Sequence, residues 1–153
     1  MAIGGLIGCA HVPTSTRPSE KEAEVHLRIL VSSEAAYSAN NGWYFDGPDC
    51  LLDAPKCLPT YPASGPPFLT PEFVQPPKGY RARFHPGAAA PQGALGPTMS
   101  KSSVTSYAYT LEPSVPGARW LCADNRPTLC VSDRALASQL PGRCPTTCKS
   151  ILP

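Results

Sequence analysis

The sequence predicts an α+β fold in which one N-terminal helix packs on an antiparallel sheet of roughly four strands. Three observations carry this prediction: an amphipathic stretch after residue 19, several short strand-like segments after residue 79, and three local pairs of cysteines. The chain has 153 residues, which suits a single domain. Its 20 prolines interrupt helices and central strands, so we expect long loops between the regular elements.

A helix is predicted from Ser19 to about Asn40. Ser19 and Glu22 form a Ser-x-x-Glu capping box, which satisfies free backbone N–H groups at the start of a helix. Apolar residues then recur at helical spacing on one face. This face consists of Ala23, Leu27, Leu30, Glu34 and Tyr37, with Val31 and Ala35 alongside. Residues 40–42 end the helix, because Asn and Gly tolerate the left-handed cap conformation, and His26 is expected on the exposed side.

Four later segments are predicted to be strands, at residues 79–86, 104–112, 118–123 and 128–132. The first alternates strictly, which indicates one apolar and one polar face. The apolar face carries Tyr80, Ala82 and Phe84, and the polar face carries Arg81, Arg83 and His85. The second is rich in β-branched and aromatic residues. The helix stripe and the apolar sheet face are expected to pack together.

Six of the seven cysteines are predicted to form disulfides, a pattern typical of small exported proteins. The pairs that lie close in the sequence are Cys50 with Cys57, Cys122 with Cys130, and Cys144 with Cys148. Six cysteines allow 15 pairings, and pairing of sequence neighbours is the simplest because short loops close at little entropic cost. Zinc binding is the alternative, although no pair has C-x-x-C spacing and no histidine lies at ligand spacing from a cysteine.

Residues 1–18 are predicted to be separate from the globular domain, which spans residues 19–153. Leu6-Ile7-Gly8-Cys9 is similar to a bacterial lipobox, so we expect Cys9 to carry a lipid that attaches the protein to a membrane. The alternative is an ordinary chain terminus with an isolated cysteine, because the apolar run is short and lacks a basic residue. Residues 11–18 are polar and turn-prone and are expected to act as a tether.

No pattern in the sequence is typical of an enzyme, a cofactor site or a nucleic-acid-binding protein. The histidines His11, His26 and His85 stand in no nucleophile motif, and surface positions are expected for them. There is no glycine-rich phosphate loop. The net charge of +2 comes without a basic cluster, which argues against nucleic acid. We therefore expect a non-catalytic protein without a cofactor.

Two further clusters have both a structural and a binding interpretation. Asp124, Asn125 and Asp133 offer oxygen atoms for calcium, but a turn is favoured because too few ligands are local. Residues 43–45 are three consecutive aromatics, Trp-Tyr-Phe, directly after the helix. They are expected to pack in the core beneath the long loop, and an exposed binding patch is the alternative.

Several sequence motifs follow one another in a defined order. They are LRIL at residues 27–30, EAAYS at 34–38, NGWY at 41–44, KGYRARF at 78–84, YAYTLEP at 107–113 and PGARWLCAD at 116–124. Together they resemble the second half of the helix and the first strands of the soluble head of type IV pilins and pseudopilins. The resemblance covers roughly residues 20–134.

The resemblance implies a structural protein of the bacterial cell envelope, related to a pilus or to type II secretion, with other pilin-like or envelope proteins as partners. The chain departs from the family because the long apolar N-terminal helix is replaced by the lipobox-like stretch. Three explanations remain: a pilin-like head on a lipid anchor, which we favour, an incomplete pilin gene, or an accessory subunit. The alternative function is an exported module that binds a ligand or glycan in the proline-rich loop. In each case we expect the periplasm, outer membrane or cell surface.

Overall fold

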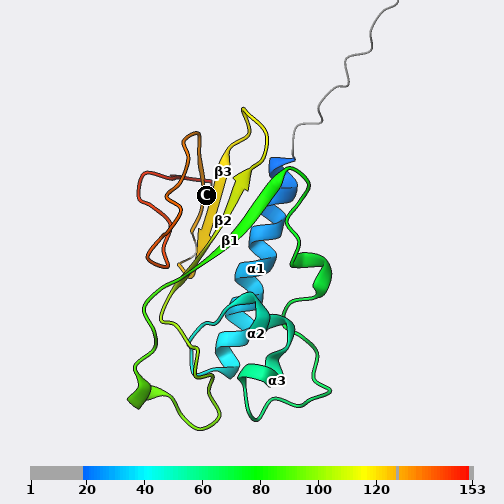
Figure 1. Cartoon of the computed structure of the whole chain (residues 1–153), viewed down its shortest axis with the longest axis vertical. Helices are drawn as coiled ribbons and strands as arrows, with labels where there is room; N and C mark the ends of the chain where they lie inside the picture. Colours follow the sequence, from blue (N-terminus) through cyan, green and yellow to red (C-terminus); the bar gives the residue numbers. More distant parts are fainter. Residues whose placement is uncertain (1–18, 127, 152–153) are drawn as a thin grey trace, which may run out of the picture.

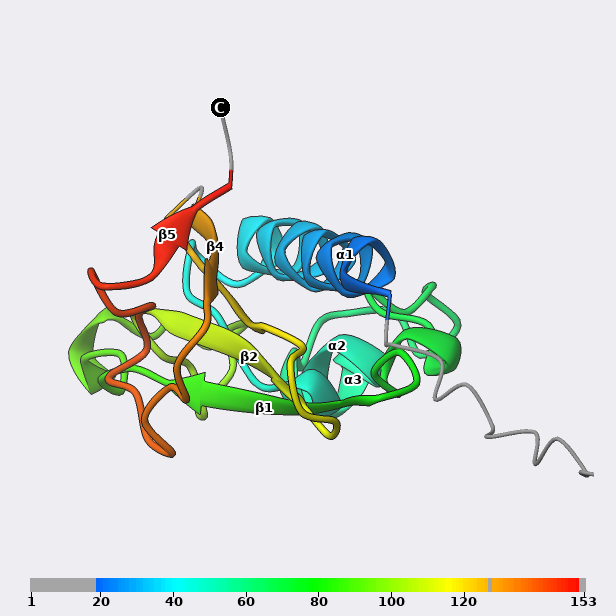
Figure 2. The same ribbon diagram turned by 90° about the horizontal axis from the view of Figure 1, so that it is seen from above.

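The computed structural model describes residues 19–126 and 128–151. Cys9, His11 and the predicted tether lie outside these residues. The described chain is arranged in three layers: a long helix, an antiparallel sheet, and a C-terminal segment on the other face of the sheet (Figures 1 and 2). The α+β class predicted from the sequence is therefore confirmed.

Helix α1 spans Glu20–Asn40. Its start is the predicted cap, because the side chain of Ser19 accepts a hydrogen bond of 3.2 Å from the backbone N–H of Glu22. Asn41 forms the C-cap and Gly42 follows with a φ of 60°. The predicted stripe on the helix is buried and faces the sheet and the loop after the helix. Its residues are Ala23, Leu27, Leu30, Glu34 and Tyr37.

The proline-rich connection after α1 contains three short helices, α2 (Pro48–Leu52), α3 (Ala54–Cys57) and the 3-10 helix η1 (Pro71–Phe73). The Cys50–Cys57 disulfide joins α2 to α3, as proximity in the sequence predicts. The carbonyl of Leu51 accepts hydrogen bonds from the N–H groups of Phe68 and Leu69, at 2.9 and 3.0 Å. These contacts hold distant parts of the connection together without a sheet.

The sheet has five strands in the order β1-β2-β3-β4-β5, all antiparallel. The strands are β1 (Tyr80–Pro86), β2 (Tyr107–Pro113), β3 (Trp120–Asp124), β4 (Thr128–Ser132) and β5 (Lys149–Ser150), with the 3-10 helix η2 (Gln92–Ala94) between β1 and β2. The first four match the predicted segments. The fifth was not predicted, because two residues carry no periodicity; it pairs with β4 through the register Cys130↔Ser150.

Each face of the sheet has its own apolar core. On the α1 side, the aromatic residues Tyr107 and Tyr109 pack with Leu111, Leu121 and the buried stripe of α1. On the opposite side a smaller cluster forms beneath the C-terminal segment. It contains Ala108, Cys122, Cys130, Leu136 and Cys144. Residues on β2 are consequently buried on both faces of the sheet.

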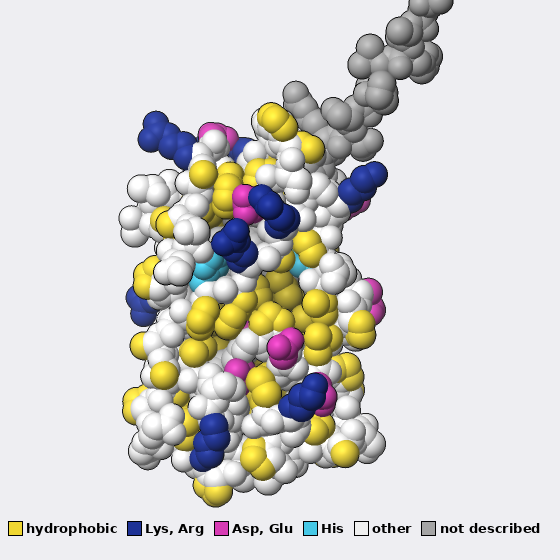
Figure 3. All heavy atoms as spheres, in the orientation of Figure 1, with side chains coloured by type: hydrophobic (Ala, Val, Ile, Leu, Met, Phe, Trp, Pro, Cys, Tyr) yellow, Lys and Arg dark blue, Asp and Glu magenta, His cyan; other side chains and the backbone are white. Residues whose placement is uncertain are grey.

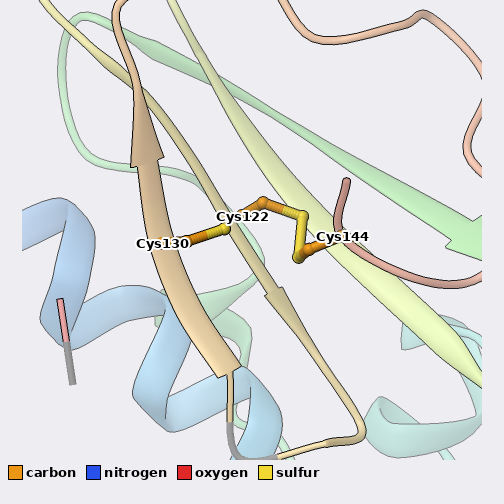
Figure 4. Close-up of side chains that lie close together, drawn as sticks. All are labelled: Cys122, Cys130 and Cys144. Atoms are coloured by element: carbon orange, nitrogen blue, oxygen red, sulfur yellow. A yellow bond between two sulfur atoms is a disulfide. The ribbon is translucent and has the colours of Figure 1, made fainter. Parts of the chain in front are cut away.

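Two of the three disulfides differ from the pairing of sequence neighbours. Cys122 bonds to Cys144, and Cys130 bonds to Cys148. The predicted bridges Cys122–Cys130 and Cys144–Cys148 are therefore wrong. Cys122 and Cys130 are register partners on β3 and β4 and belong to the cluster away from α1, where the C-terminal segment crosses them (Figure 4). Each strand cysteine thus fixes this segment to the sheet.

Candidate interaction surface along helix α1

The side of α1 that faces away from the sheet is uncovered in the described part of the chain. Figure 2 shows α1 along one side of the molecule, with the sheet and α2 and α3 on its inner side. Val25 lies on the outer side and is 49% exposed. Val25 and Trp43 are the two exposed large hydrophobic side chains among the described residues.

A groove of about 660 Å³ runs between the first half of α1 and the loop around η1, and we call it the α1 groove. Its apolar wall consists of Val25, Ile29, Phe73, Pro76 and Pro77. Its polar members are Ser19, Lys21, Glu22, His26, Glu72 and Gln75. An apolar channel with a polar rim is suited to binding a hydrophobic side chain.

His26 lies in this groove and is only 5% exposed, so the expected exposed position is wrong. It follows Val25 directly, at the border between the outer side and the buried stripe. Its Nε2 atom is buried and has no hydrogen-bond partner within the described residues. Burial lowers the pKa of the imidazole, so the ring is neutral at pH 7. The wall of the α1 groove therefore contains an unpaired polar nitrogen.

Two smaller hollows continue this surface along α1. One, of about 320 Å³, lies between α1 and β4 and includes Val31 and Leu129. The other, of about 380 Å³, includes Ile29, Ala36 and Phe68. With the α1 groove, they make the helix a ridge with apolar depressions on both sides. Such a ridge is typical of a surface that contacts another protein.

Trp43 stands at the opposite end of α1 from the α1 groove. It is 76% exposed, so the expected core position is wrong for this residue. Its φ of 69° lies in the left-handed region, which a residue with a bulky side chain rarely adopts. The conformation allows its N–H to donate a hydrogen bond of 2.8 Å to the carbonyl of Ser38. Phe45, by contrast, packs against Tyr107 with ring centroids 4.9 Å apart, as expected for a core residue.

The surface carries no concentration of one charge on the face that Figure 3 shows, where Lys and Arg side chains are scattered and hydrophobic atoms occupy the middle. Several of the charges are paired. Arg119 forms a salt bridge of 2.6 Å with Glu20, which fixes the start of α1 to the segment before β3. Arg81 pairs with Glu112 across β1 and β2 at 2.7 Å. These pairs hold elements together and do not form a charged binding site.

A buried polar cluster lies inside the domain, between α1, β2 and the loop before β2. Glu34 accepts a hydrogen bond of 2.8 Å from Tyr109, and burial raises the pKa of its carboxyl group to about 8. Asp46 accepts hydrogen bonds from Tyr37, at 3.3 Å, and from the hydroxyl of Ser100. Glu34 is 0% and Asp46 4% exposed, so neither carboxylate meets a substrate from solvent. The cluster connects α1, β2 and the two loops that carry Asp46 and Ser100.

Asp124, at the end of β3 before the turn, is fully buried, and its carboxylate is bonded to other protein groups. The guanidinium of Arg126 and the backbone N–H of Cys144 both donate to its carboxylate, the latter at 2.9 Å. Asp133 is exposed in the next loop. Calcium binding by Asp124, Asn125 and Asp133 is therefore not supported, because the carboxylate at the centre already has cationic and N–H partners.

His85 is also buried, at 5% exposure, so the surface position expected for it is wrong, although the alternation of β1 places it on the polar face as predicted. The C-terminal segment covers it. Its Nδ1 accepts a hydrogen bond of 3.3 Å from the N–H of Leu140, and its Nε2 lies 2.9 Å from the hydroxyl of Thr110. Burial, together with the nearby charge of Arg83, lowers the pKa of the ring. His85 thus holds the C-terminal segment on the sheet.

Two groups of cysteine sulfurs are close enough to bind a metal if they were free. The sulfur atoms of Cys122, Cys130 and Cys144 lie within 4.8 Å of one another. Figure 4 shows the three side chains. The sulfurs of Cys50 and Cys57 lie equally close to a carboxylate oxygen of Asp46. All five sulfurs are in disulfides and are not thiolates, so the arrangement does not favour the zinc alternative.

No helix in residues 19–126 or 128–151 combines the length and the apolar character needed to cross a bilayer. Comparison of the chain with family models, curated proteins and solved structures finds no match in any of the three. The candidate site therefore rests on geometry alone: a ridge along α1, a groove at its start, and an exposed tryptophan at its end. The aromatic run at residues 43–45 and the helix periodicity were its only signals in the sequence.

Proposed function

We propose that this chain is a structural, non-catalytic protein of the bacterial cell envelope that resembles the soluble head of a pilin or pseudopilin. The observation that carries the proposal is the exposed ridge of α1, which offers apolar hollows on both sides for contact with other subunits. Its partners are other pilin-like or envelope proteins. The motif resemblance over residues 20–134 supports the same conclusion.

The three-layer architecture supports a load-bearing role. The helix, the sheet and the C-terminal segment are joined by salt bridges, a buried polar cluster and three disulfides. Disulfides persist in oxidising compartments, so they support a location in the periplasm, in the outer membrane or at the cell surface. Cys9 lies outside the described residues. Attachment to a membrane through a lipid on Cys9 is therefore part of the proposal.

Cross-linking in intact cells tests the role directly. An epitope-tagged copy at the native locus is treated with a membrane-permeant cross-linker, and the envelope fraction is analysed by mass spectrometry. We expect adducts to pilin-like or secretion-related envelope proteins, formed through lysines near α1 such as Lys21. Replacing Lys21 by Arg, while the exposed Lys56 on α3 is kept, should reduce these adducts.

Two outcomes bear on parts of the proposal separately. Labelling with a palmitate analogue that is lost in Cys9→Ser supports the lipid anchor, and absence of label in the wild type removes it. Recovery of the chain in the envelope without any adduct to a pilin-like protein contradicts the assembly role.

The alternative is an exported module that binds a small ligand or glycan beside the proline-rich loop. The observation that favours it is the α1 groove, whose wall includes Pro76, Pro77 and Phe73 from this loop. Screening the purified chain against a glycan array and a fragment library distinguishes the two functions. A ligand that binds in the α1 groove and is lost in Phe73→Ala supports the module, and an empty screen supports the assembly role.

A further inference from the structure

We propose that the side chain of Trp43 in one copy of this chain inserts into the α1 groove of a second copy. The inference deepens the proposed function, on which it rests, by naming the partner and the contact. Trp43 is the most exposed large hydrophobic side chain of the described residues, and the groove is the largest hollow characterised on them.

The positions of Trp43 and of the α1 groove along the helix determine the symmetry of the contact. The α1 groove centres on residues 22–29, and Trp43 follows the end of the helix. At about 1.5 Å per residue, His26 and Trp43 lie about 25 Å apart, so a subunit does not fill its own groove. Trp43, which we call the knob, and the α1 groove are thus different surfaces at opposite ends of α1. A contact between them is heterologous and adds copies in a row rather than closing a twofold dimer.

The two surfaces are chemically complementary. An indole has a large apolar face and a single N–H donor. The groove has the apolar wall described above and, at His26, a buried neutral imidazole nitrogen without a partner. Because Nε2 is buried in the single copy, the His26 side chain must turn towards the groove before this nitrogen accepts the indole N–H, in the tautomer that carries its proton on Nδ1.

Charge supports the same orientation. The rim of the groove has two exposed carboxylates, Glu22 and Glu72, and one ammonium group, Lys21. Lys101 is exposed. It follows Ser100, whose N–H donates a hydrogen bond of 2.8 Å to the side chain of Asn41, two residues before Trp43. Stacking copies head to tail brings Lys101 towards the carboxylates. It also aligns the dipoles of successive α1 helices.

The strained backbone at Trp43 is a second, independent indication of function. Glycine adopts a φ of 69° without strain, whereas tryptophan there is unfavourable and buries little of its surface. Within the domain the conformation gains the hydrogen bond from the Trp43 N–H to the carbonyl of Ser38, but the side chain is 76% exposed and adds little packing. Burial in a second copy would supply the compensation.

Size predicts that the contact is weak in isolation. One tryptophan contributes roughly 150–250 Å² of buried surface, whereas stable protein interfaces bury about 1,200–2,000 Å² in total. The copies should therefore be monomeric when dilute. They should associate when concentrated, or when they are held side by side on an envelope surface, where effective concentrations reach the millimolar range.

Two complementary variants of the full chain test the inference. Trp43→Gly removes the knob in a backbone conformation that glycine favours, and Val25→Asp places a charge in the groove at an exposed helix position. Ala35→Asp is the matched control, because Ala35 is exposed on the same helix but lines neither the α1 groove nor the two smaller hollows beside α1. Association is followed by sedimentation and by the NMR resonance of the Trp43 indole N–H. Protein concentrations up to about 1 mM cover the weak dissociation constants expected.

Wild type and Ala35→Asp should both associate, with an indole resonance that shifts with concentration. Each of the two variants alone should associate at least about tenfold more weakly. In a mixture, the Trp43 resonance of labelled Val25→Asp should shift when unlabelled Trp43→Gly is added, because only that pair combines an intact knob with an intact groove. The mixture should stop at dimers.

A wild type that stays monomeric at 1 mM, or a Trp43→Gly variant that associates as strongly as the wild type, overturns the inference. So does a mixture in which the indole resonance does not move. These results concern the purified chain and do not depend on where the protein resides. If the purified chain does not associate but the cells give envelope recovery and pilin-like adducts, only the Trp43 contact is removed. If the purified chain associates through Trp43 but the cells give no such adducts, only the proposed function is removed.

Discussion

The carboxyl group of Glu34 on α1 accepts a hydrogen bond of 2.8 Å from the hydroxyl of Tyr109 on β2, in the centre of the core between the helix and the sheet. A carboxyl group at this depth is stable when it is protonated, and burial raises its pKa to about 8. The second oxygen of Glu34 has no partner among the described residues. This hydrogen-bonded contact between the two layers is therefore sensitive to pH.

The stability of the domain should fall as the pH rises from about 4.5 to about 8. In this window the folded state keeps the proton on Glu34 and the unfolded state loses it, so the slope is negative, up to about 1.4 kcal/mol per pH unit. Glu34→Gln removes the group that titrates. The difference in unfolding free energy between wild type and Glu34→Gln, measured in urea at several pH values, should change with this slope. Equal slopes in the two proteins contradict the assignment, and Glu24→Gln, on the same helix, should behave as wild type.

Removal of the Cys122–Cys144 disulfide should destabilise the domain more than removal of Cys50–Cys57. The first closes a loop of 22 residues and the second one of 7. Loop-closure entropy then predicts losses of about 3 and about 2 kcal/mol for the paired alanine variants. Chemical denaturation gives these values. Digestion without reduction should yield peptides joined through Cys122–Cys144 and Cys130–Cys148, and a peptide joined through Cys122–Cys130 is incompatible with the fold described.

The C-terminal segment should loosen in mild acid. Protonation of His85 removes the acceptor for the N–H of Leu140, and the lowered pKa of His85 means that the folded state resists this charge. Its contribution to stability is present above about pH 6.5 and is lost as the pH falls through its folded pKa. Hydrogen-exchange protection of the Leu140 amide should decrease below pH 6.5.

The Cys144 amide serves as the internal control for this prediction, because it bonds to the buried carboxylate of Asp124 at 2.9 Å. Its protection should persist over the same range. Parallel loss of protection at both amides would instead indicate a general opening of the C-terminal segment. In His85→Gln the pH dependence at Leu140 should disappear.

Trp43→Gly should leave the domain as stable as the wild type or more stable by roughly 1 kcal/mol. The side chain is 76% exposed, and its left-handed backbone costs a residue with a Cβ atom about 1–2 kcal/mol that glycine does not lose. Greater flexibility of glycine in the unfolded chain offsets part of this gain. Thermal and urea unfolding measure the change. A loss of more than 1 kcal/mol would mean that Trp43 has a role within the domain. Trp43→Val, which cannot relax the backbone, should be less stable than Trp43→Gly.

Local signals in the sequence account for the elements of the fold. The Ser19 cap, the spacing of the buried stripe and the glycine at residue 42 predict α1 within one residue. Alternation and β-branched composition predict four of the five strands because each strand has a buried face. These features depend on neighbours in the chain, and they are readable from the chain alone.

Features that depend on the C-terminal segment were not predictable in this way. The periodicity of β1 places His85 on the face away from the helix, and only the tertiary structure brings Leu140 over it. The pairing of Cys122 with Cys144 has the same origin, since proximity in the sequence favours Cys130. Exposure of Trp43 depends on the left-handed turn after Gly42, and the aromatic run itself does not distinguish core from surface. The candidate surface was thus only partly predictable.

The oxidation state of the cysteines in fractionated cells tests the central claim most directly. Cells are quenched in acid, treated with a maleimide polymer before and after reduction, and separated into cytoplasmic and envelope fractions. We predict that the protein lies in the envelope fraction and that six cysteines, Cys50, Cys57, Cys122, Cys130, Cys144 and Cys148, react only after reduction. Recovery in the cytoplasmic fraction with these six thiols free would contradict the account of an exported, disulfide-fixed envelope protein.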